Sequence, residues 1–259
     1  MTPETVGAYL EVLERYSPQV LITYPSLAHH FVNCIEEQGY SRRIFDLVLC
    51  SSEALYDYQR KRLESVFRAR VRIHYGHIES CAFFSNCEKS TLYHDQMEYG
   101  YTEFRKRDGT PAGEGESGEI IATGFDNYTM PLIRFRTQDW AERGVGKCDC
   151  GRNYPLVARI EGREGDFIQT PSGRTYSPII LEFLVDGTVG FADLQIVQSK
   201  IDDLVVKVVP GRDFTRERLD DFCSALHARL DGEISVSSEL VEVIPRSDRQ
   251  KKSLVVSEL

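Results

Sequence analysis

Three cysteines and one histidine in the middle of the chain have the side-chain chemistry of a metal site. They form a Cys…His…Cys-x-Cys pattern made by Cys87, His94, Cys148 and Cys150. Thiolates with one imidazole suit tetrahedral Zn²⁺, and four protein ligands would leave no open coordination position, so this zinc would be structural. The Cys-x-Cys spacing is tighter than is usual for zinc motifs, and the alternative is three free thiols beside a surface histidine. Cys81 and His77 are the substitute ligands.

Polar residues also follow two predicted strands directly. Residues 51–55 (Ser-Ser-Glu-Ala-Leu) come after the run 47–50, and residues 75–79 (Tyr-Gly-His-Ile-Glu) come at the end of the run 71–75. Because ligands collect at the carboxyl ends of strands in an open α/β layer, both segments are predicted to border a ligand. Three further polar segments stand out later in the chain, at residues 131–139, 162–166 and 245–251.

The best-known single motifs of nucleotide and hydrolase chemistry are missing. Residues 144–148 (Gly-Val-Gly-Lys-Cys) lack the upstream glycine of a phosphate loop, and Cys148 replaces the Ser or Thr that would hold magnesium. The sequence has no G-x-S-x-G elbow, no H-E-x-x-H and no G-x-G-x-x-G between a strand and a helix. Any chemistry must therefore come from separated segments that the fold brings together.

The elements that would position these segments change in character along the chain. Up to residue 76 the pattern alternates strand and helix, which predicts a parallel α/β layer. Its expected helices begin at Thr2-Pro3-Glu4, run from Pro25 to a cap at Gly39, and span 57–67, and its expected strands are 20–22, 47–50 and 71–75. Residues 77–165 read as a β-rich subdomain with strands at 118–124 and 131–137.

A third unit is expected from about Asp166. It has apolar strands at 194–197 and 204–209, a helix over 214–230 with Leu219, Phe222 and Leu226 on one side, and a strand over 235–243. The predicted fold class is thus α/β plus α+β, with a large domain over 1–165, divided at 76/77 into the α/β layer and the β-rich subdomain carrying the zinc site. A small α+β domain follows over 166–259.

Composition limits the function classes. The 259 residues are 41% hydrophobic and 27% charged, as in ordinary globular proteins. With 31 basic and 40 acidic residues the net charge is −9, which argues against nucleic-acid partners and anionic membranes. No apolar run approaches the ~20 residues of a membrane span, no secretory signal is visible, and seven scattered cysteines do not form a disulfide framework. A cytoplasmic protein is expected.

Taken in order, the separated segments resemble the adenylate-forming ligases, and within them the phenylacetate–coenzyme A ligase and CapK-like (capsular polysaccharide biosynthesis) branch. The resemblance runs from Tyr24 to Lys251, and residues 127–134 and 148–152 favour this branch, whose members often carry the Cys/His set. It implies ATP-dependent activation of a carboxylic acid to an acyl-adenylate, with release of pyrophosphate. Transfer to a thiol, usually coenzyme A, would follow. The implied cofactors are ATP/AMP, Mg²⁺, structural Zn²⁺ and coenzyme A.

The resemblance also implies residue roles. The adenine would be bordered by Ser52, Glu53 and Ala54, and the nucleotide flanked by Tyr75 and Gly76. Glu79 would hold magnesium, and Asp139 would bind the ribose hydroxyls. Arg163 would lie near ribose and phosphate, Asp166 would be the hinge of a mobile C-terminal lid, and Lys251 would be the lysine of the adenylation step. Attack on the α-phosphate needs mainly positioning and charge neutralisation, which a magnesium carboxylate and a flexible ammonium supply.

Each residue alone has a plainer interpretation. Glu79 could be a surface acid or cap, Asp139 could form a solvated ion pair with Arg136, and residues 51–53 could be a helix-starting turn. Arg163 and Asp166 could be a linker pair, and Lys251 lies in an ordinary charged run. Only the joint order and spacing of the segments favours the ligase interpretation.

The sequence departs from the family pattern in four places. Ile78 replaces a threonine, Gln138 and Gln250 replace glycines, and the Ser/Thr/Gly-rich phosphate loop would lie upstream of residue 1. The chain is therefore expected to be the carboxyl-terminal part of such a ligase, incomplete alone, with an upstream amino-terminal half or a second copy as partner. The alternative is a non-catalytic, zinc-stabilised nucleotide-binding or interaction module. A zinc hydrolase is a weaker alternative, because four protein ligands leave no coordination position for a catalytic water.

Overall fold

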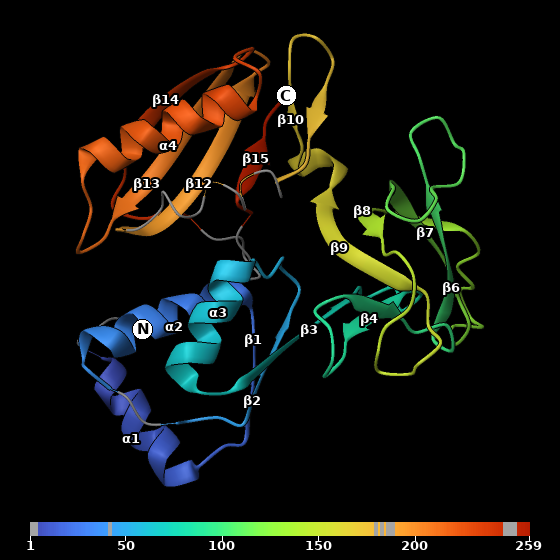
Figure 1. The fold of residues 1–259 in the computed structure, drawn as a ribbon, viewed down its shortest axis with the longest axis horizontal. Coiled ribbons are helices and arrows are strands. Elements are labelled where there is room, and N and C mark those ends of the chain that lie inside the picture. Colours follow the sequence, from blue (N-terminus) through green and yellow to red (C-terminus); the bar gives the residue numbers. More distant parts are fainter. Residues whose placement is uncertain (1–4, 41–42, 179–180, 182–183, 185–189, 246–252) are drawn as a thin grey trace. The chain divides into compact units, whose positions relative to one another are not determined.

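The structure is a computed structural model that describes the chain except for residues 1–4, 41–42, 179–180, 182–183, 185–189 and 246–252 (Figure 1). It contains two compact units, Met1–Glu161 and Gly162–Leu259. The expected helix start at Thr2-Pro3-Glu4 and the expected Lys251 site lie outside the described residues. No helix in the described part of the chain is long and apolar enough to cross a membrane.

The first unit begins with the predicted alternation of strand and helix. Its elements are α1 (Val6–Tyr16), β1 (Val20–Thr23), α2 (Pro25–Glu37), β2 (Leu47–Ser51), α3 (Asp57–Phe67) and β3 (Arg70–Gly76). β2 pairs in parallel with both β1 and β3. Pro25 stands in the first turn of α2, where its missing N–H costs no helical hydrogen bond, and Gly39 follows the helix at φ 65°, as expected of a left-handed cap.

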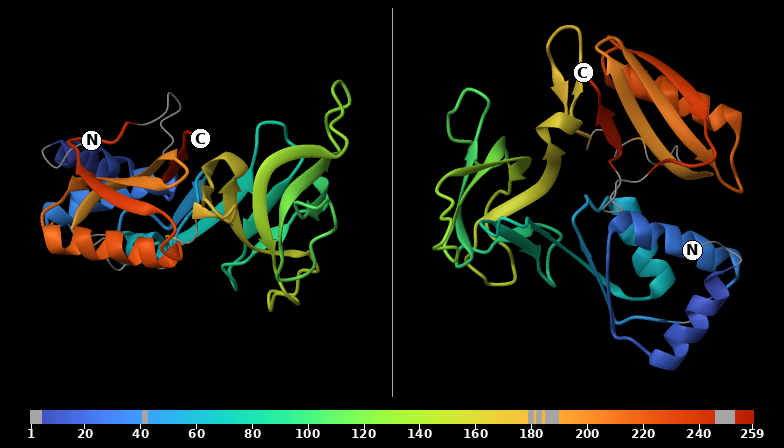
Figure 2. Two further views of the ribbon diagram at one scale, coloured as in Figure 1. Left: turned by 90° about the horizontal axis from the view of Figure 1, so that it is seen from above. Right: turned by 180° about the vertical axis from the view of Figure 1, so that it is seen from behind.

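The three helices cover one face of these parallel strands (Figures 1 and 2). Alternate strand residues on that face are buried, among them Val48 and Val71, and pack in one core with Leu63 and Phe67 of α3. The other alternate positions of β1 and β2 face away from this core. That set is Val20, Ile22, Leu47 and Leu49, all of them exposed or half-buried.

The sheet continues without a break into the β-rich part. The added strands are β4 (Phe83–Asn86), β5 (Tyr93–Asp95), β6 (Gly100–Arg105), β7 (Ser117–Gly124), β8 (Phe135–Arg143) and β9 (Leu156–Arg163), and the nine-stranded order is β1-β2-β3-β4-β5-β9-β8-β7-β6. The strand expected over residues 131–137 was wrong for its first part, because β8 starts only at Phe135. Pro131 has no N–H for a ladder, and Arg134 has φ 52°, which is incompatible with a strand.

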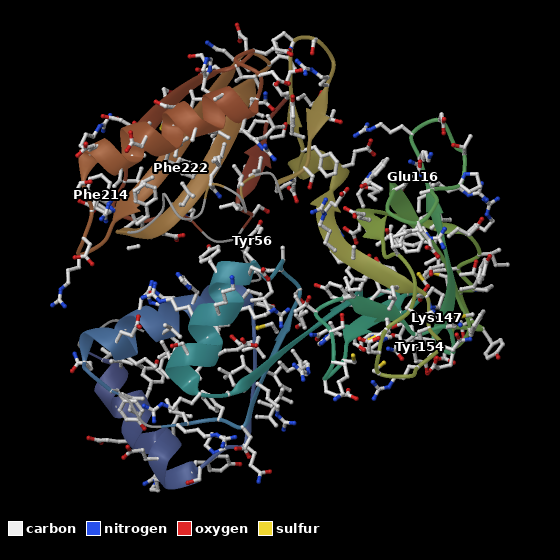
Figure 3. All side chains as sticks on the ribbon, in the orientation of Figure 1. Tyr56, Glu116, Lys147, Tyr154, Phe214 and Phe222 are labelled. Carbon is white, nitrogen blue, oxygen red and sulfur yellow. The ribbon has the colours of Figure 1, made fainter. Side chains whose placement is uncertain are left out.

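The second unit is the expected small α+β structure. Its elements are η1 (Glu164–Asp166), β10 (Ile168–Gln169), β11 (Thr175–Tyr176), β12 (Phe191–Lys200), β13 (Asp203–Pro210), α4 (Arg216–Arg229), β14 (Ser235–Leu240) and β15 (Val255–Ser257). The four longer strands form a sheet in the order β14-β13-β12-β15. α4 buries Leu219, Phe222 and Leu226, as its spacing predicts. Phe214 and Phe222 both pack on Phe191 (Figure 3).

Candidate functional site

Two of the expected ligand-binding segments leave the sheet at the same edge. Ser51, the last residue of β2, is the register partner of His74 in β3. The segments that follow, 52–54 and 76–79, therefore both extend from the carboxyl ends of parallel neighbours, where α/β proteins bind ligands. Ser52 has φ 68° and, like Ala54, an exposed side chain, so this loop turns sharply out of the sheet.

The Glu53 carboxylate is hydrogen-bonded to the first turn of α2. Its Oε2 accepts a hydrogen bond from the Ser26 N–H at 3.0 Å, and its Oε1 accepts one from the Ser26 hydroxyl at 3.1 Å. Ser26 stands in the first turn of α2, where unpaired N–H groups and the helix dipole favour a carboxylate. The plainer interpretation of residues 51–53 as a helix-starting turn was wrong, because α3 begins only at Asp57 with Tyr56 as its cap.

Tyr75 and Asp139, separated by 64 residues, are in direct contact. The Tyr75 hydroxyl donates a hydrogen bond of 2.7 Å to Asp139 Oδ2, which joins β3 to β8. The Tyr75 ring stacks on Phe84 with centroids 5.1 Å apart, and Asp139 is only 8% exposed. Burial, together with the adjacent Asp139 carboxylate, raises the pKa of Tyr75 well above its usual value. The phenol is therefore a firm hydrogen-bond donor to this carboxylate.

A bulge in β8 directs Asp139 toward Tyr75. The β7–β8 register jumps between the pairs Glu119–Trp140 and Ile121–Arg136, and Gln138 in the bulge has φ 63°. The Thr137 hydroxyl secures this turn, since it donates to the Ile120 carbonyl at 2.8 Å and accepts from the Asp139 N–H at 3.1 Å. Gln138 stands where the resembled family has glycine, and it keeps the left-handed backbone that glycine would adopt without strain.

Glu79 lies in the turn after β3. Its Oε2 is 3.3 Å from His77 Nδ1, and its side chain is partly exposed. The His77 ring packs between Tyr75 and Phe135, which places Glu79 on the same side of the unit as the Tyr75–Asp139 pair. Arg136, which was considered as an ion-pair partner of Asp139, pairs with the buried Glu119 at 2.6 Å.

The remaining predicted nucleotide residues belong to the second unit. Arg163 ends β9 with an exposed side chain, and Asp166 lies in the short helix η1. Lys251 and Gln250 are outside the described residues. The structure therefore brings together Tyr75, Gly76, Glu79 and Asp139 in the first unit, and it holds Glu53 against α2 near the same edge of the sheet.

The four predicted metal ligands converge. Cys87 follows β4, His94 lies in β5, and Cys148 and Cys150 lie between β8 and β9; their ligand atoms are all within 4.8 Å of one another. Two of the separations are 3.6 Å, between the sulfurs of Cys87 and Cys148, and 3.3 Å, from Cys150 Sγ to His94 Nε2. Metal–ligand bonds of about 2.0–2.3 Å at tetrahedral angles require spacings near these.

One thiol of the cluster, that of Cys150, has a lowered pKa. A hydrogen bond from the Arg152 backbone is the largest influence that lowers the pKa of Cys150 to about 6, so this sulfur is anionic at neutral pH. The suggested substitute ligands, Cys81 and His77, do not belong to the cluster of Cys87, His94, Cys148 and Cys150. They contact one another instead, with Cys81 Sγ 3.7 Å from His77 Nε2. Donor set and spacing therefore fit a single closed zinc site.

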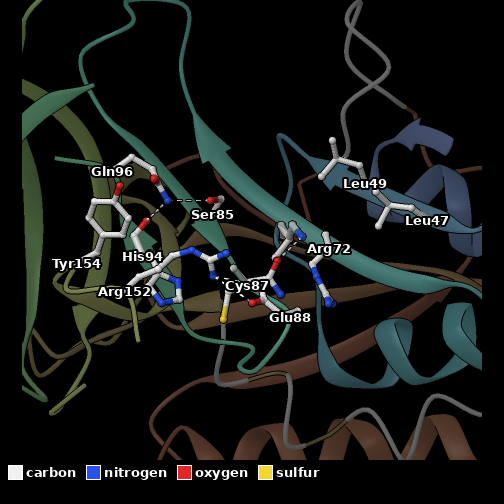
Figure 4. A pocket seen from close by; sticks show the side chains of 12 residues that line it. Leu47, Leu49, Arg72, Ser85, Cys87, Glu88, His94, Gln96, Arg152 and Tyr154 are labelled. Carbon is white, nitrogen blue, oxygen red and sulfur yellow. Dashed lines mark hydrogen bonds and ion pairs between the residues drawn. The ribbon is translucent and has the colours of Figure 1, made fainter. Parts of the chain in front are cut away.

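One feature escaped the sequence-based interpretation. A hollow of about 410 Å³ lies beside the Cys/His cluster, with Leu47, Leu49 and Arg72 on one side and His94, Arg152 and Tyr154 on the other (Figure 4). The apolar run 47–50 predicted a strand, and only Val48 and Cys50 of these four residues are buried. The sequence shows that these residues are apolar, but it does not show that Leu47 and Leu49 lie on a face of the strand that is only partly buried.

Comparisons with known proteins agree with the resemblance. Residues 168–258 match the family model described as the CapK C-terminal domain. Protein CapK of Staphylococcus aureus is 23% identical over 99% of this chain and 56% of its own length. Phenylacetate-coenzyme A ligase of Escherichia coli (strain K12) is 23% identical over 92% of this chain and 58% of its own length.

Solved structures share the fold. A 2-hydroxyisobutyryl-CoA ligase in the postadenylation state, in complex with R3-HIB-AMP, matches 98% of this chain and 57% of its own with a TM-score of 0.79 at 20% identity. The anthranilate CoA ligase AuaEII in complex with anthranoyl-AMP matches 97% and 51% with a TM-score of 0.70 at 12% identity. The predicted resemblance and fold class are confirmed, and the chain spans less than three fifths of the length of these relatives.

Proposed function

We propose that this chain is the carboxyl-terminal part of an AMP-forming acyl-CoA ligase. The complete enzyme would activate a carboxylic acid with ATP and Mg²⁺ to an acyl-adenylate and pyrophosphate, and would then transfer the acyl group to coenzyme A. Residues 1–165 would form the partial nucleotide-binding domain and residues 166–259 the lid. An amino-terminal part would supply the phosphate-gripping loop. Use of ATP and coenzyme A fits the cytoplasmic location expected from the sequence.

The observation that carries this proposal is the contact of Tyr75 with Asp139. It joins two of the separated segments that the ligase interpretation requires to meet. In the proposed site Asp139 binds the ribose hydroxyls, Tyr75 and Gly76 flank the nucleotide, and Ser52, Glu53 and Ala54 border the adenine. Glu79 would hold Mg²⁺. Arg163 would approach ribose and phosphate, and Lys251 would neutralise phosphate charge during adenylation.

Nucleotide binding by the chain tests the site directly. Titration with AMP, followed by calorimetry, should give one binding event, and Asp139→Asn should weaken it about tenfold or more by removing a charge-assisted hydrogen bond to the ribose. Asp108→Asn is the matched control, because Asp108 is an exposed carboxylate whose hydrogen bonds are to Thr110 in a turn. Equal effects of the two changes would reject Asp139 as a nucleotide ligand.

Pyrophosphate exchange tests the reaction. With ATP, Mg²⁺ and a panel of aryl and alkyl acids, exchange is expected once the amino-terminal part is supplied, and Lys251→Ala should abolish it. If no acid supports exchange even with that part present, the ligase proposal is wrong and a non-catalytic binding module becomes the better explanation.

We also propose that Cys87, His94, Cys148 and Cys150 hold one structural Zn²⁺. The support is the donor set and the mutual spacing of the ligand atoms within 4.8 Å. The ion would join the turn after β4 to the loop between β8 and β9, and so brace two segments of the unit that contains Tyr75 and Asp139. Metal analysis of purified protein should find about one equivalent, lost in Cys148→Ser.

A further inference from the structure

His77 is a buried imidazole that the proposed chemistry does not use. Its side chain is only 9% exposed, and its ring packs against the rings of Tyr75 and Phe135. The backbone turns sharply here, because the Ser80 N–H donates to the His77 carbonyl at 3.1 Å. The turn directs His77 inward, while the next residue, Ile78, is 87% exposed. A polar ring in this position needs partners for its nitrogens, since an unpaired buried polar group is costly.

Both ring nitrogens of His77 have a neighbour. Nδ1 is 3.3 Å from Glu79 Oε2, and Nε2 is 3.7 Å from Cys81 Sγ. The two neighbours differ in kind, because an ionised carboxylate only accepts hydrogen bonds whereas a thiol also donates them. They differ in exposure as well, since the Glu79 side chain is 38% exposed and Cys81 is fully buried. His77 therefore links a carboxylate at the surface to a fixed group in the interior.

Cys81 is held firmly by the backbone around it. A Cβ added to Gly100 would overlap the Cys81 carbonyl oxygen, and one added to Gly124 would lie 3.0 Å from the Cys81 Cβ. Burial raises the pKa of the Cys81 thiol to about 11, so its S–H is present at neutral pH and can donate to His77 Nε2. A neutral imidazole that accepts at Nε2 carries its proton on Nδ1 and donates there, toward Glu79.

We propose that His77 is a positioning residue for the Glu79 carboxylate, and that Cys81 fixes its imidazole in the tautomer with the proton on Nδ1. This role rests on the proposed function, in which Glu79 would hold Mg²⁺. Carboxylates that bind metal ions are commonly oriented by a hydrogen bond from a neighbouring group, and loss of that group weakens metal binding about 10- to 100-fold. A carboxylate already held in one orientation also loses less side-chain entropy when the ion binds.

The tautomer can be observed without nucleotide or metal. A long-range proton–nitrogen NMR spectrum of the full chain, labelled with ¹⁵N-histidine, distinguishes protonated from bare ring nitrogens. Loss of signals in His77→Asn identifies those of His77 among the six histidines. At neutral pH we expect the proton on Nδ1 and none on Nε2, and Cys81→Ala should allow the tautomer with a proton on Nε2 to appear. A proton on Nε2 of the unaltered chain overturns the proposal.

Two substitutions separate the roles of the two nitrogens. His77→Asn keeps a donor near the position of Nδ1, and His77→Gln keeps one near the position of Nε2. The readout is the factor by which Mn²⁺ strengthens ATP binding to the full chain, measured by calorimetry. This factor should fall about tenfold in His77→Gln and stay within about threefold in His77→Asn. His30→Gln is the matched control, because His30 Nε2 also lies 3.7 Å from a thiol, that of Cys34 on α2, and it should change nothing. Circular dichroism checks that the variants fold.

Equal changes in His77→Asn and His77→Gln, including no change in either, would make His77 a packing residue and overturn the proposal. If Mn²⁺ does not strengthen ATP binding by the unaltered chain, Glu79 does not hold the ion and the proposal is overturned as well. Failure of the proposed function looks different from these results. An AMP titration without binding rejects the nucleotide site itself, whereas AMP binding with no selective effect of His77→Gln rejects only the positioning role.

Discussion

The proposed metal cluster (Cys87, His94, Cys148 and Cys150) and the proposed nucleotide-binding cluster (Glu53, Tyr75, Glu79 and Asp139) of the first unit are built in opposite ways. In the metal cluster, the ligand atoms of Cys87, His94, Cys148 and Cys150 point at one another. In the proposed nucleotide-binding cluster, each carboxylate already has a protein neighbour: Glu53 has Ser26, Glu79 has His77, and Asp139 has Tyr75. Ligand atoms that point at one another suit a permanently bound metal ion. Carboxylates that already accept hydrogen bonds from protein groups suit a ligand that replaces those donors when it binds and releases them when it leaves.

This difference has an energetic meaning. Soft donors held within contact distance bind a metal tightly, and the binding energy becomes folding energy. A buried carboxylate with a hydrogen-bonded partner is stable without ligand, and a ribose hydroxyl can replace that donor at small net cost. We therefore expect the fold to depend strongly on the metal cluster and only moderately on the nucleotide-binding one.

Removing the metal should have the largest effect. Chelation, or Cys148→Ser, is expected to lower the free energy of unfolding of the first unit by about 5 kcal/mol or more, since a structural zinc contributes directly to folding. Urea denaturation with and without chelator measures this. Cys223→Ser on α4, outside the cluster, is the matched control. A metal-free protein with unchanged stability would contradict the comparison.

Removing the Tyr75 hydroxyl should have a moderate effect. Tyr75→Phe deprives the buried Asp139 of a donor at 2.7 Å and is expected to cost about 1–3 kcal/mol of stability. Tyr128→Phe, at an 89% exposed tyrosine, should change urea denaturation by less than about 0.5 kcal/mol. A cost for Tyr75→Phe as large as that of metal removal would erase the proposed difference between the clusters.

Relieving the backbone strain at Gln138 should raise the free energy of unfolding by a small amount. A residue with a Cβ at φ 63° carries about 1–2 kcal/mol of strain, while glycine costs about 0.5–1 kcal/mol in unfolded-chain entropy. Gln138→Gly is therefore expected to stabilise the first unit by about 0.5 kcal/mol. Gln138→Ala retains the Cβ and should give no gain in the same denaturation experiment. A loss of stability in the glycine variant would show that the Gln138 side chain itself supports the bulge.

Proton release on zinc uptake should give the smallest signal. Because the pKa of Cys150 is lowered to about 6, its thiol is already ionised at pH 7.5, so zinc binding should release about two protons from the three thiols. As the pH falls below 6, Cys150 takes up its proton and the release from the three thiols should rise toward three, with any proton carried by His94 released in addition. Calorimetry in buffers of different ionisation enthalpy measures this number. Release of three protons already at pH 7.5 would contradict the assignment of Cys150 as the thiolate.

Several features of the molecule could be predicted from the sequence. The alternation of apolar runs predicted the parallel layer β1–β3 and its helices, and the spacing of Leu219, Phe222 and Leu226 predicted the buried side of α4. The Cys/His set could be named as a group because thiolates with one imidazole suit zinc, although free thiols and the substitutes Cys81 and His77 remained alternatives. These are consequences of side-chain chemistry and of the 2.0 and 3.6 residue periods, which are local properties.

Other features were decided by the tertiary structure. The binding of Glu53 to α2, the bulge that turns Asp139 toward Tyr75, and the open face at Ile22 depend on register, on loop paths and on which surfaces meet. Periodicity tells which residues share a face of a strand, but not what lies against that face. Contacts between segments 64 residues apart arise only when the whole sheet has formed, because the strands between them set both distance and direction.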